Sequence, residues 1–337
     1  MQTMKLALVV AAFGALGTTF SNAQSVEEFY RGKQVRFVIH SAPGGPYDSW
    51  ARLLGQYFSK YVPGQPIFVP QNMPGAGGLV ATNYLYTKAP QDGSVIGMVG
   101  RNIPSDAVIR GAATFDPRRF NWIGNPERGA TVAIVSDKSP AKTAKDLFAR
   151  EVLFGGAGAG SAVSQMPLVI GGALGMKLKL VEGYGSQSAI TLALERGEVH
   201  GAFTTLTSVR GFFPGQVESG KLHILFNLED KPVPGLNAPS IFEFAKTDEQ
   251  KQLLNLLAVS SEVGRPVLAP PGTPADRVAA LRSAFDHSVQ DAQFRADAAK
   301  MNLPVDVVSG PELQVIIEKL MATPSATVER MKALTQQ

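Results

Sequence analysis

The stretch that decides the fold is VRFVIHSAPGGPYDSWARLLGQYFSKYV, residues 35–62. Apolar residues at every second position from Val35 to Ile39 predict a short β-strand. From Trp50 onward, apolar residues recur every three or four positions, which predicts an amphipathic helix. The segment SAPGGPYD, residues 41–48, lies between the two. The stretch therefore predicts a strand, a glycine loop and a helix in succession.

The glycine loop is a candidate anion site. Gly44 and Gly45 allow backbone conformations closed to other residues and let a ligand approach the main chain. The helix that follows directs the unpaired N–H groups of its first turn, and its positive dipole end, toward the same place. Asp is also among the best helix-capping residues. The residues alone thus allow either an anion site or a plain turn in which Asp48 caps the helix.

Length and composition limit the classes of protein that fit. With 337 residues and 45% hydrophobic content, the chain can bury a large core and is expected to form two domains. The net charge of +4 is small, and no run of Lys and Arg alternates with aromatic residues, so nucleic acid is not an expected partner. Loops matter more than charge networks here, because charged residues make up only 18% of the chain and glycine is abundant.

The N-terminus resembles an export signal. Lys5 supplies the positive charge, residues 6–20 form an apolar run, and small residues end at Ala23. We therefore expect residues 1–23 to be a signal peptide that is cleaved near Ala23, and the product to be periplasmic. The apolar run is too short and weak to cross about 30 Å of hydrocarbon. The absence of cysteine excludes disulfides, thiolate metal sites and a cysteine nucleophile.

The rest of the chain repeats the opening unit. Val152–Phe154 is followed by a glycine-rich segment, 155–161, and by a helix expected at 162–174. Alternating strands and helices predict an α/β fold with parallel sheets covered by helices. Ligands of such sheets collect at the carboxyl ends of the strands.

Several polar residues follow predicted strands at that edge. Arg101 and Asn102 follow the strand expected at Val95–Val99, and Thr204 ends a strand expected at Val199–Phe203. Arg101 is either a second carboxylate clamp or a solvated residue, and the sequence does not separate the two.

No other motif in the sequence predicts a cofactor site or a catalytic site. Gly158, Gly160 and Ser161 resemble a dinucleotide fingerprint, but Ser161 or Val163 falls where the final glycine belongs. GQVESGK, residues 215–221, lacks the Ser or Thr that a phosphate-binding loop needs next. No Gly-x-Ser-x-Gly motif occurs. We expect no cofactor and no enzymatic activity.

A metal site is not expected either. The four histidines, His40, His200, His223 and His287, lie far apart in the sequence without a ligand spacing. His40 directly precedes the glycine loop, and a packed or surface side chain is the expected state.

Five stretches together resemble one known family. They are APGGPYDSWARLL, QNMPGAGGLVATNYLYTKAPQDGSVIGM, GGAGAGSAVSQMPLVIGGALG, ALERGEVHGAF and LAPPGTPADRVAALRSAFDHSV. In this order they are similar to the solute-binding proteins of the tripartite tricarboxylate transporter family. The resemblance implies an α/β, two-lobed type II periplasmic binding protein fold, in which each lobe is a mostly parallel sheet flanked by helices. It also implies lobe 1 at 24–125 plus 258–337 and lobe 2 at 126–257, with the ligand between them.

The resemblance further implies a function. The protein is expected to capture a small organic anion, a carboxylate, and to deliver it to the membrane permease subunits of a transporter. An exported enzyme acting on a small carboxylate and a sensory receptor without transport are the alternatives. The expected ligand-binding residues are Pro43, Gly44, Gly45, Tyr47, Asp48, Arg101, Asn102, Gly160, Ser161, Gly185 and Thr204. Tyr47 is expected to tune ligand choice, and Asp48 to meet the ammonium group if the ligand is an amino acid.

Overall fold

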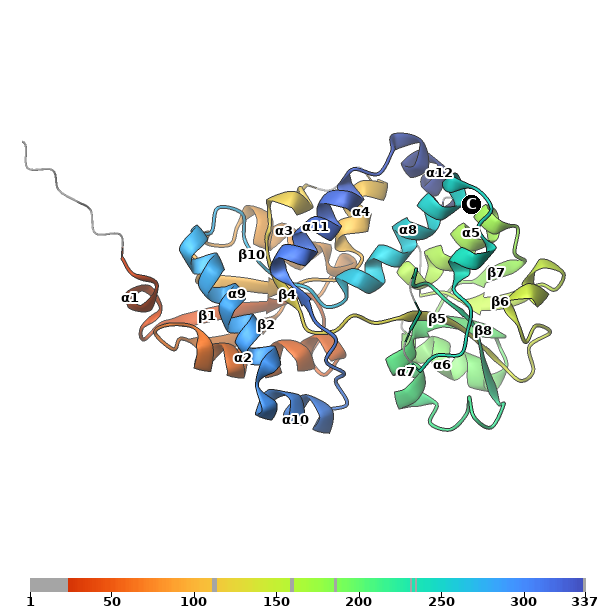
Figure 1. Ribbon diagram of the computed structural model, residues 1–337, viewed down its shortest axis with the longest axis horizontal. Coiled ribbons are helices and arrows are strands. Elements are labelled where there is room, and N and C mark those ends of the chain that lie inside the picture. The colour runs from red at the N-terminus through yellow and green to blue at the C-terminus, as the bar shows by residue number, and fades with distance from the viewer. Residues whose placement is uncertain are drawn as a thin grey trace, which may run out of the picture.

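The computed structural model describes residues 24–110, 114–157, 161–184, 187–230, 232–233 and 235–335. The expected signal peptide, Gly160 and Gly185 lie outside these residues. Figure 1 shows two halves side by side, each built around its own β-sheet and joined by extended crossing segments and by the helix labelled α8. The α/β, two-lobed architecture expected from the sequence is confirmed.

The first sheet has strands from both ends of the chain, in the order β11-β4-β10-β3-β1-β2. The strands are β1 (Gln34–Ile39), β2 (Ile67–Asn72), β3 (Val95–Met98), β4 (Asn121–Asn125), β10 (Val267–Ala269) and β11 (Val308–Ser309). The second sheet has the order β7-β6-β8-β5-β9 and is built from the middle of the chain. Its strands are β5 (Thr131–Ser136), β6 (Val152–Gly155), β7 (Leu178–Val181), β8 (Gly201–Thr205) and β9 (Leu222–Asn227).

Most strands of each sheet run in the same direction, with β10 and β11 reversed in the first sheet and β5 reversed in the second. In the first sheet, β1 pairs in parallel with β2 and β3, whereas β10 runs antiparallel to β3 and β4. In the second, β6 pairs in parallel with β7 and β8, whereas β5 runs antiparallel to β8 and β9. The expectation of mostly parallel sheets is thus confirmed, and β5 and β10 are reversed because they enter their sheets from the opposite half.

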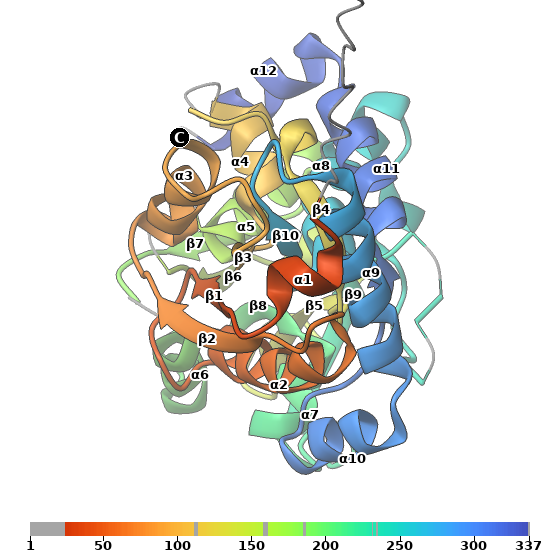
Figure 2. The same cartoon turned by 90° about the vertical axis from the view of Figure 1, so that its left-hand side faces the viewer.

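Helices cover both faces of the first sheet. They are α1 (Val26–Tyr30), α2 (Pro46–Tyr61), α3 (Leu79–Thr87), α4 (Ile103–Arg110), α9 (Ala275–Gln290), α10 (Ala292–Lys300) and α11 (Gly310–Met321). Phe37 and Ile39 of β1 pack with α2 and α9, while Val38 packs on the opposite face with α3. Figure 2 shows α3 and α9 on the two sides of this sheet. The alternation read at Val35–Ile39 therefore belongs to a strand that is buried on both faces.

The second sheet is covered in the same way. Its helices are α5 (Ala162–Leu174), α6 (Gln187–Arg196), α7 (Leu206–Phe212) and α8 (Asp248–Val263). The last helix, α12 (Ser325–Thr335), packs against α5, where Leu334 lies over Gly172. One apolar cluster runs from α3 and α11 through α8 to α5 and α12, so the two halves share part of their core.

Helix α2 shows how the sequence produces this packing. Gly45 is its N-cap and Pro46 its first residue, where the fixed φ of proline suits a helix. Trp50, Leu54 and Phe58 lie on one face and are fully buried. Burial of each such side chain contributes about 1.5–3 kcal/mol. The helix is thus held firmly against the sheet, and its first turn has a fixed place beside the glycine loop.

Two segments carry the chain between the halves. The first runs from β4 at Asn125 to β5 at Thr131, and the second runs from the end of α8 through Gly264 to β10. The exact lobe boundaries stay a prediction.

Across the described residues, no helix combines the length and the apolar character needed to span a bilayer.

Candidate functional site

The glycine loop joins β1 to α2 at the edge of the first sheet that faces the second half. Gly44 has a φ of +84°, which favours glycine, and its N–H donates to Oδ2 of Asp48 at 2.9 Å. Gly45 is extended, with a φ of −86°. Only Gly44 therefore needs the conformational freedom of glycine, while Gly45 keeps side-chain atoms away from the start of the helix.

Asp48 fixes the conformation of this loop through hydrogen bonds. Its side chain is 4% exposed and accepts hydrogen bonds from Arg52 Nε at 2.9 Å and Asn72 Nδ2 at 3.0 Å, besides the Gly44 N–H. Burial alone would raise its pKa, but these three donors outweigh burial and lower the pKa to about 2. The carboxylate is therefore ionised and occupied by protein donors. This leaves the N–H groups of the first helical turn as the part of the loop that can meet an anion.

Tyr47 connects the loop to its surroundings. Its hydroxyl accepts a hydrogen bond from the Arg101 N–H at 3.2 Å and donates to the Gly264 carbonyl at 3.5 Å. The guanidinium of Arg265 lies over its ring, with the Cζ atom 4.7 Å from the centroid. Tyr47 thus fixes the start of α2 to the loop after β3 and to the second crossing segment.

Arg101 extends from the first half to the first crossing segment. Its Nη1 atom lies 3.9 Å from the point that a Cβ on Gly129 would occupy, and Thr205 Cγ2 lies 3.2 Å from the same point. Within the part of the chain that the structure describes, the guanidinium has no ion pair or hydrogen bond. Burial is the main cause that lowers the pKa of Arg101. The side chain nevertheless stays charged at neutral pH, because the delocalised guanidinium of arginine is not deprotonated in proteins.

His40 packs between Tyr47, after the glycine loop, and Gly78, at the start of α3. Its Nδ1 atom lies 3.0 Å from the position of a Cβ on Gly78, and its ring meets Tyr47 edge-on with centroids 4.3 Å apart. The Nε2 atom is buried and has no hydrogen-bond partner among the described residues. Burial, and then the charge of Arg265, lower the pKa of His40 to about 4. The imidazole is therefore neutral at physiological pH.

The predicted residues of the second half have local roles that the structure makes visible. Ser161 is the N-cap of α5, and its hydroxyl accepts from the Ser164 N–H at 3.3 Å. Thr204 is 6% exposed within β8, opposite Val132. The next residue, Thr205, caps α7 and lies beside Gly129.

The structure therefore brings the predicted residues of the first half together around Tyr47. Gly44, Gly45 and Tyr47 open α2, while Arg101 and Asn102 form the loop after β3. Ser161 and Thr204 belong to the other sheet. No hydrogen bond among the described residues joins Ser161 or Thr204 to the first group. Gly129, Thr205 and Arg265 are neighbours of the site that the sequence analysis missed.

The missed residues gave little sequence signal. Thr205 adjoins Thr204, and the alternation of a strand could have identified it as the residue that faces the other way. Gly129 and Arg265 lie in segments without periodicity, so only their position between the sheets identifies them.

A buried ion pair ties the two crossing segments together. Glu127 is 2% exposed, and its Oε2 accepts from Arg265 Nε at 2.7 Å and from the indole N–H of Trp50. Asn125 Oδ1 accepts from the N–H groups of Glu127 and Arg265. The junction is thus built from paired polar groups and has one fixed arrangement in this structure.

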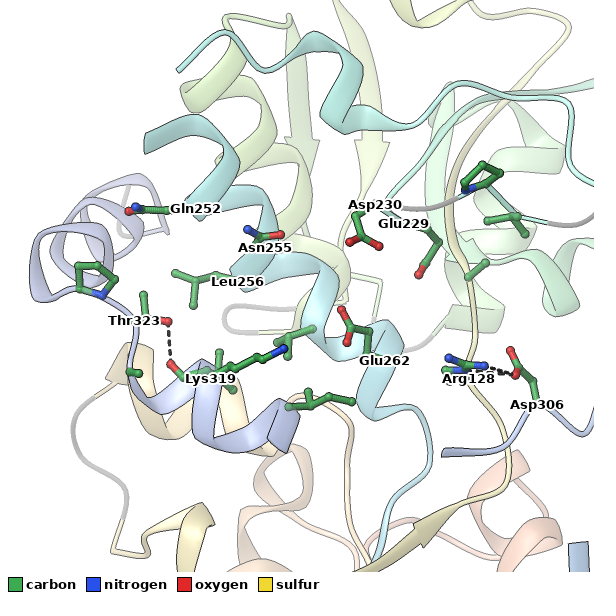
Figure 3. Close-up of a pocket in the computed structure, with 18 residues that line it drawn as sticks. Arg128, Glu229, Asp230, Gln252, Asn255, Leu256, Glu262, Asp306, Lys319 and Thr323 are labelled. Atoms are coloured by element: carbon green, nitrogen blue, oxygen red, sulfur yellow. Dashed lines mark hydrogen bonds and ion pairs between the residues drawn. The ribbon is translucent and has the colours of Figure 1, made fainter. Parts of the chain in front are cut away.

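A separate pocket of about 740 Å³ opens between the halves near α8 and α11. Figure 3 shows Glu229, Asp230 and Glu262 directed toward it, with Lys319 on the facing helix and Arg128 paired to Asp306. None of the predicted ligand residues that the structure describes lines this pocket. The acidic side chains also make it a poor place for an anion, so we do not assign the ligand to it.

Glu229 of this pocket should make stability depend on pH. The pKa of Glu229 is raised to about 7, mainly by burial. Hydrogen bonds from the Thr131 N–H and from Ser261 lower the pKa, but the charges of Glu262 and Asp230 add to the rise. A raised carboxyl pKa means that the folded protein binds the proton more tightly. The associated stability is present below the unfolded pKa of about 4.5 and is lost as pH rises through 7.

We therefore expect Glu229→Gln to be more stable than the wild type at pH 8, by up to about 3 kcal/mol, and equally stable at pH 4. Urea denaturation of both proteins at several pH values measures this difference. Glu218→Gln is the matched control, because Glu218 is an exposed glutamate that does not line the pocket. An equal difference at pH 4 and pH 8 would show that Glu229 does not titrate in this way.

No group of three His, Asp or Glu side chains in the described ranges is placed to hold a metal ion.

Comparison with known proteins identifies relatives. The family model described as "Tripartite tricarboxylate transporter family receptor" matches residues 51–334. A curated relative from Agrobacterium vitis, "UPF0065 protein in the TAR-I ttuE-ttuC' intergenic region", is 33% identical over 174 residues, which are 49% of each protein. The chain therefore spans about half the length of the curated relative that it matches.

Solved structures share the fold at low identity. A TctC solute-binding protein from Polaromonas has a TM-score of 0.67 and 16% identity, covering 91% of this chain and 99% of its own. A Rhodopseudomonas palustris protein with adipate has a TM-score of 0.64 and 20% identity, covering 90% and 97%. MatC from the same organism, with bound malate, has a TM-score of 0.61 and 18% identity, covering 90% and 99%.

The family match extends over most of the chain, from the first turns of α2 to α12, and includes the loops around Arg101 and Ser161. The chain belongs to the tripartite tricarboxylate transporter receptor family, a family of receptors and not of enzymes.

Proposed function

We propose that the protein is an exported, periplasmic receptor that captures a small organic carboxylate between its two halves and hands it to the permease subunits of a membrane transporter. The observation that carries the proposal is the loop at the start of α2. There Asp48 accepts the Gly44 N–H, the first turn of α2 begins with N–H groups that have no partner within the helix, and the Arg101 N–H bonds to the Tyr47 hydroxyl. Family membership and the adipate and malate held by structural relatives support a carboxylate as the ligand.

The proposed site divides between the halves. In the first half, Pro43, Gly44, Gly45 and Tyr47 would offer main-chain and hydroxyl groups, with Arg101 and Asn102 beside them. In the second half, Ser161 and Thr204 would contribute, together with Gly160 and Gly185 outside the described residues. Asp48 would act by holding the loop, because its own oxygens are occupied. The proposed lobes are 24–125 plus 258–337 and 126–257.

Such contacts are sufficient in energy. A hydrogen bond to a charged group contributes about 1.5–3 kcal/mol, and micromolar binding requires about 8 kcal/mol. Four to six contacts from the loop and its neighbours reach that value after ordering costs. Binding therefore needs no metal and no covalent chemistry.

The test uses the mature chain in calorimetry against malate, adipate, citrate, benzoate and acetate. At least one should bind saturably with micromolar affinity and should be recovered unchanged by NMR. Absence of binding to all five would contradict the proposal. Chemical conversion of a bound carboxylate would favour the exported enzyme.

Gly44→Val tests the loop itself. Valine strains a backbone with a φ of +84°, so the loop should shift and binding should fall at least tenfold. Gly32→Val is the matched control, since Gly32 has a φ of +69° and, like Gly44, has open space where a Cβ would lie. Equal affinity of the two folded variants would contradict the assignment of the loop.

A further inference from the structure

We propose that Arg101 is the specificity-determining residue of this site, and that it selects ligands with a second anionic group, which it binds at the junction of the two halves. The inference rests on the proposed carboxylate site. It adds the chemical class of the ligand and the residue that distinguishes this class from others. It arises from a charged side chain that the protein itself leaves without a counterion.

The position of Arg101 suits this role. Tyr47, in the first turn of α2, accepts a hydrogen bond from the Arg101 N–H, so the loop after β3 is fixed to the start of the helix. From there the guanidinium extends to Gly129 of the first crossing segment, and Gly129 also lies beside Thr205 at the head of α7. A ligand whose first carboxylate meets the N–H groups of α2 would thus find Arg101 on the far side of Tyr47.

The acidic residues near Arg101 are already engaged. Glu127 pairs with Arg265 and accepts from Trp50, and Glu229 accepts from the Thr131 N–H. Arg265 adds a repulsive charge, and Tyr47 is the remaining ionisable group that acts on Arg101. No carboxylate of the described residues lies within ion-pair distance of its guanidinium. Gly129, moreover, has no side chain that could cover it.

A partly buried, unpaired guanidinium is costly for the protein, because its charge is removed from water without compensation. A carboxylate removes this cost, since it can accept two parallel hydrogen bonds from the planar guanidinium. The gain depends on a second anionic group in the ligand. A monocarboxylate that uses its only charge at α2 leaves Arg101 unpaired.

The experiment compares ligand pairs that differ only in the second carboxylate: succinate with butyrate, glutarate with pentanoate and adipate with hexanoate. Calorimetry on the wild type should give an affinity ratio of about 10 to 100 in favour of the dicarboxylate of the pair that binds. In Arg101→Gln the ratio should fall to about threefold or less, while the affinity for the monocarboxylate stays the same. Arg31→Gln is the control, because Arg31 is an exposed arginine paired with Glu27, and it should keep the wild-type ratio.

Arg101→Lys keeps the charge but loses the bidentate geometry, so its ratio should lie between those of the wild type and Arg101→Gln. If Arg101→Gln does not fold, Arg101→Lys still tests whether the guanidinium determines the affinity ratio. A wild-type ratio that persists in either variant would overturn the role of Arg101 and leave the receptor function intact. If no carboxylate of any pair binds the wild type, the role of Arg101 is overturned; the receptor function fails only if malate, adipate, citrate, benzoate and acetate do not bind either.

Discussion

Gly264→Ala is expected to destabilise the protein by at least about 3 kcal/mol, through a clash and a strained backbone acting together. Gly264 ends α8 with a φ of +59° and a ψ of −115°. A Cβ there would lie 2.1 Å from the Glu127 carbonyl oxygen and 2.5 Å from Asn125 Nδ2. These neighbours are backbone and a hydrogen-bonded amide, so neither can move away cheaply. Urea denaturation, monitored by circular dichroism, measures the loss.

A control variant, Gly220→Ala, separates the cost of backbone strain from the cost of a steric clash. Gly220 has a φ of +73° and open space where a Cβ would lie, so Gly220→Ala carries only the backbone cost. That cost is about 1 kcal/mol. Similar losses in the two variants would show that the packing of the crossing segments around Gly264 is looser than described here.

Glu127→Ala is expected to cost about 3–5 kcal/mol, because it leaves the largely buried Arg265 side chain without its carboxylate and the Trp50 indole N–H without its acceptor. The loss should appear as a lower midpoint of thermal and urea unfolding. Ligand affinity should fall as well, since Tyr47 bonds to Gly264 and packs on Arg265.

Glu27→Ala provides the comparison, because the Glu27 pair with Arg31 is exposed and should contribute less than about 1 kcal/mol. A double-mutant cycle of Glu127→Ala with Arg265→Met isolates the coupling between the two side chains. A coupling energy near zero would mean that the ion pair does not hold the crossing segments together.

The sequence predicted the elements whose patterns are local. The alternation at Val35–Ile39 and the spacing from Trp50 gave β1 and α2, which the structure confirms. Helix α8 was not predicted, although Thr247 and Gln250 form a capping box at its start. From Leu253 onward nearly every residue of the helix is buried, so a one-sided apolar pattern was absent.

The candidate site could be predicted only in part, for a physical reason. Gly44, Gly45 and Asp48 adjoin one another in the sequence, so the loop was visible as a motif. The partners of Asp48 were not, because Asn72 reaches it from the end of β2. The approach of Arg101 to Gly129 and Thr205 depends on how the two sheets face each other, which no local pattern encodes.

The most direct test of the two-lobed receptor is small-angle X-ray scattering with and without a saturating carboxylate, chosen from those that bind in calorimetry. A ligand that contacts both halves favours the arrangement in which they are close, and only this differential affinity can shift the population. We expect a smaller radius of gyration in the saturated sample, with no change on adding acetate at the same ionic strength if acetate does not bind. An unchanged radius of gyration at proven saturation would contradict a carboxylate held between the two halves.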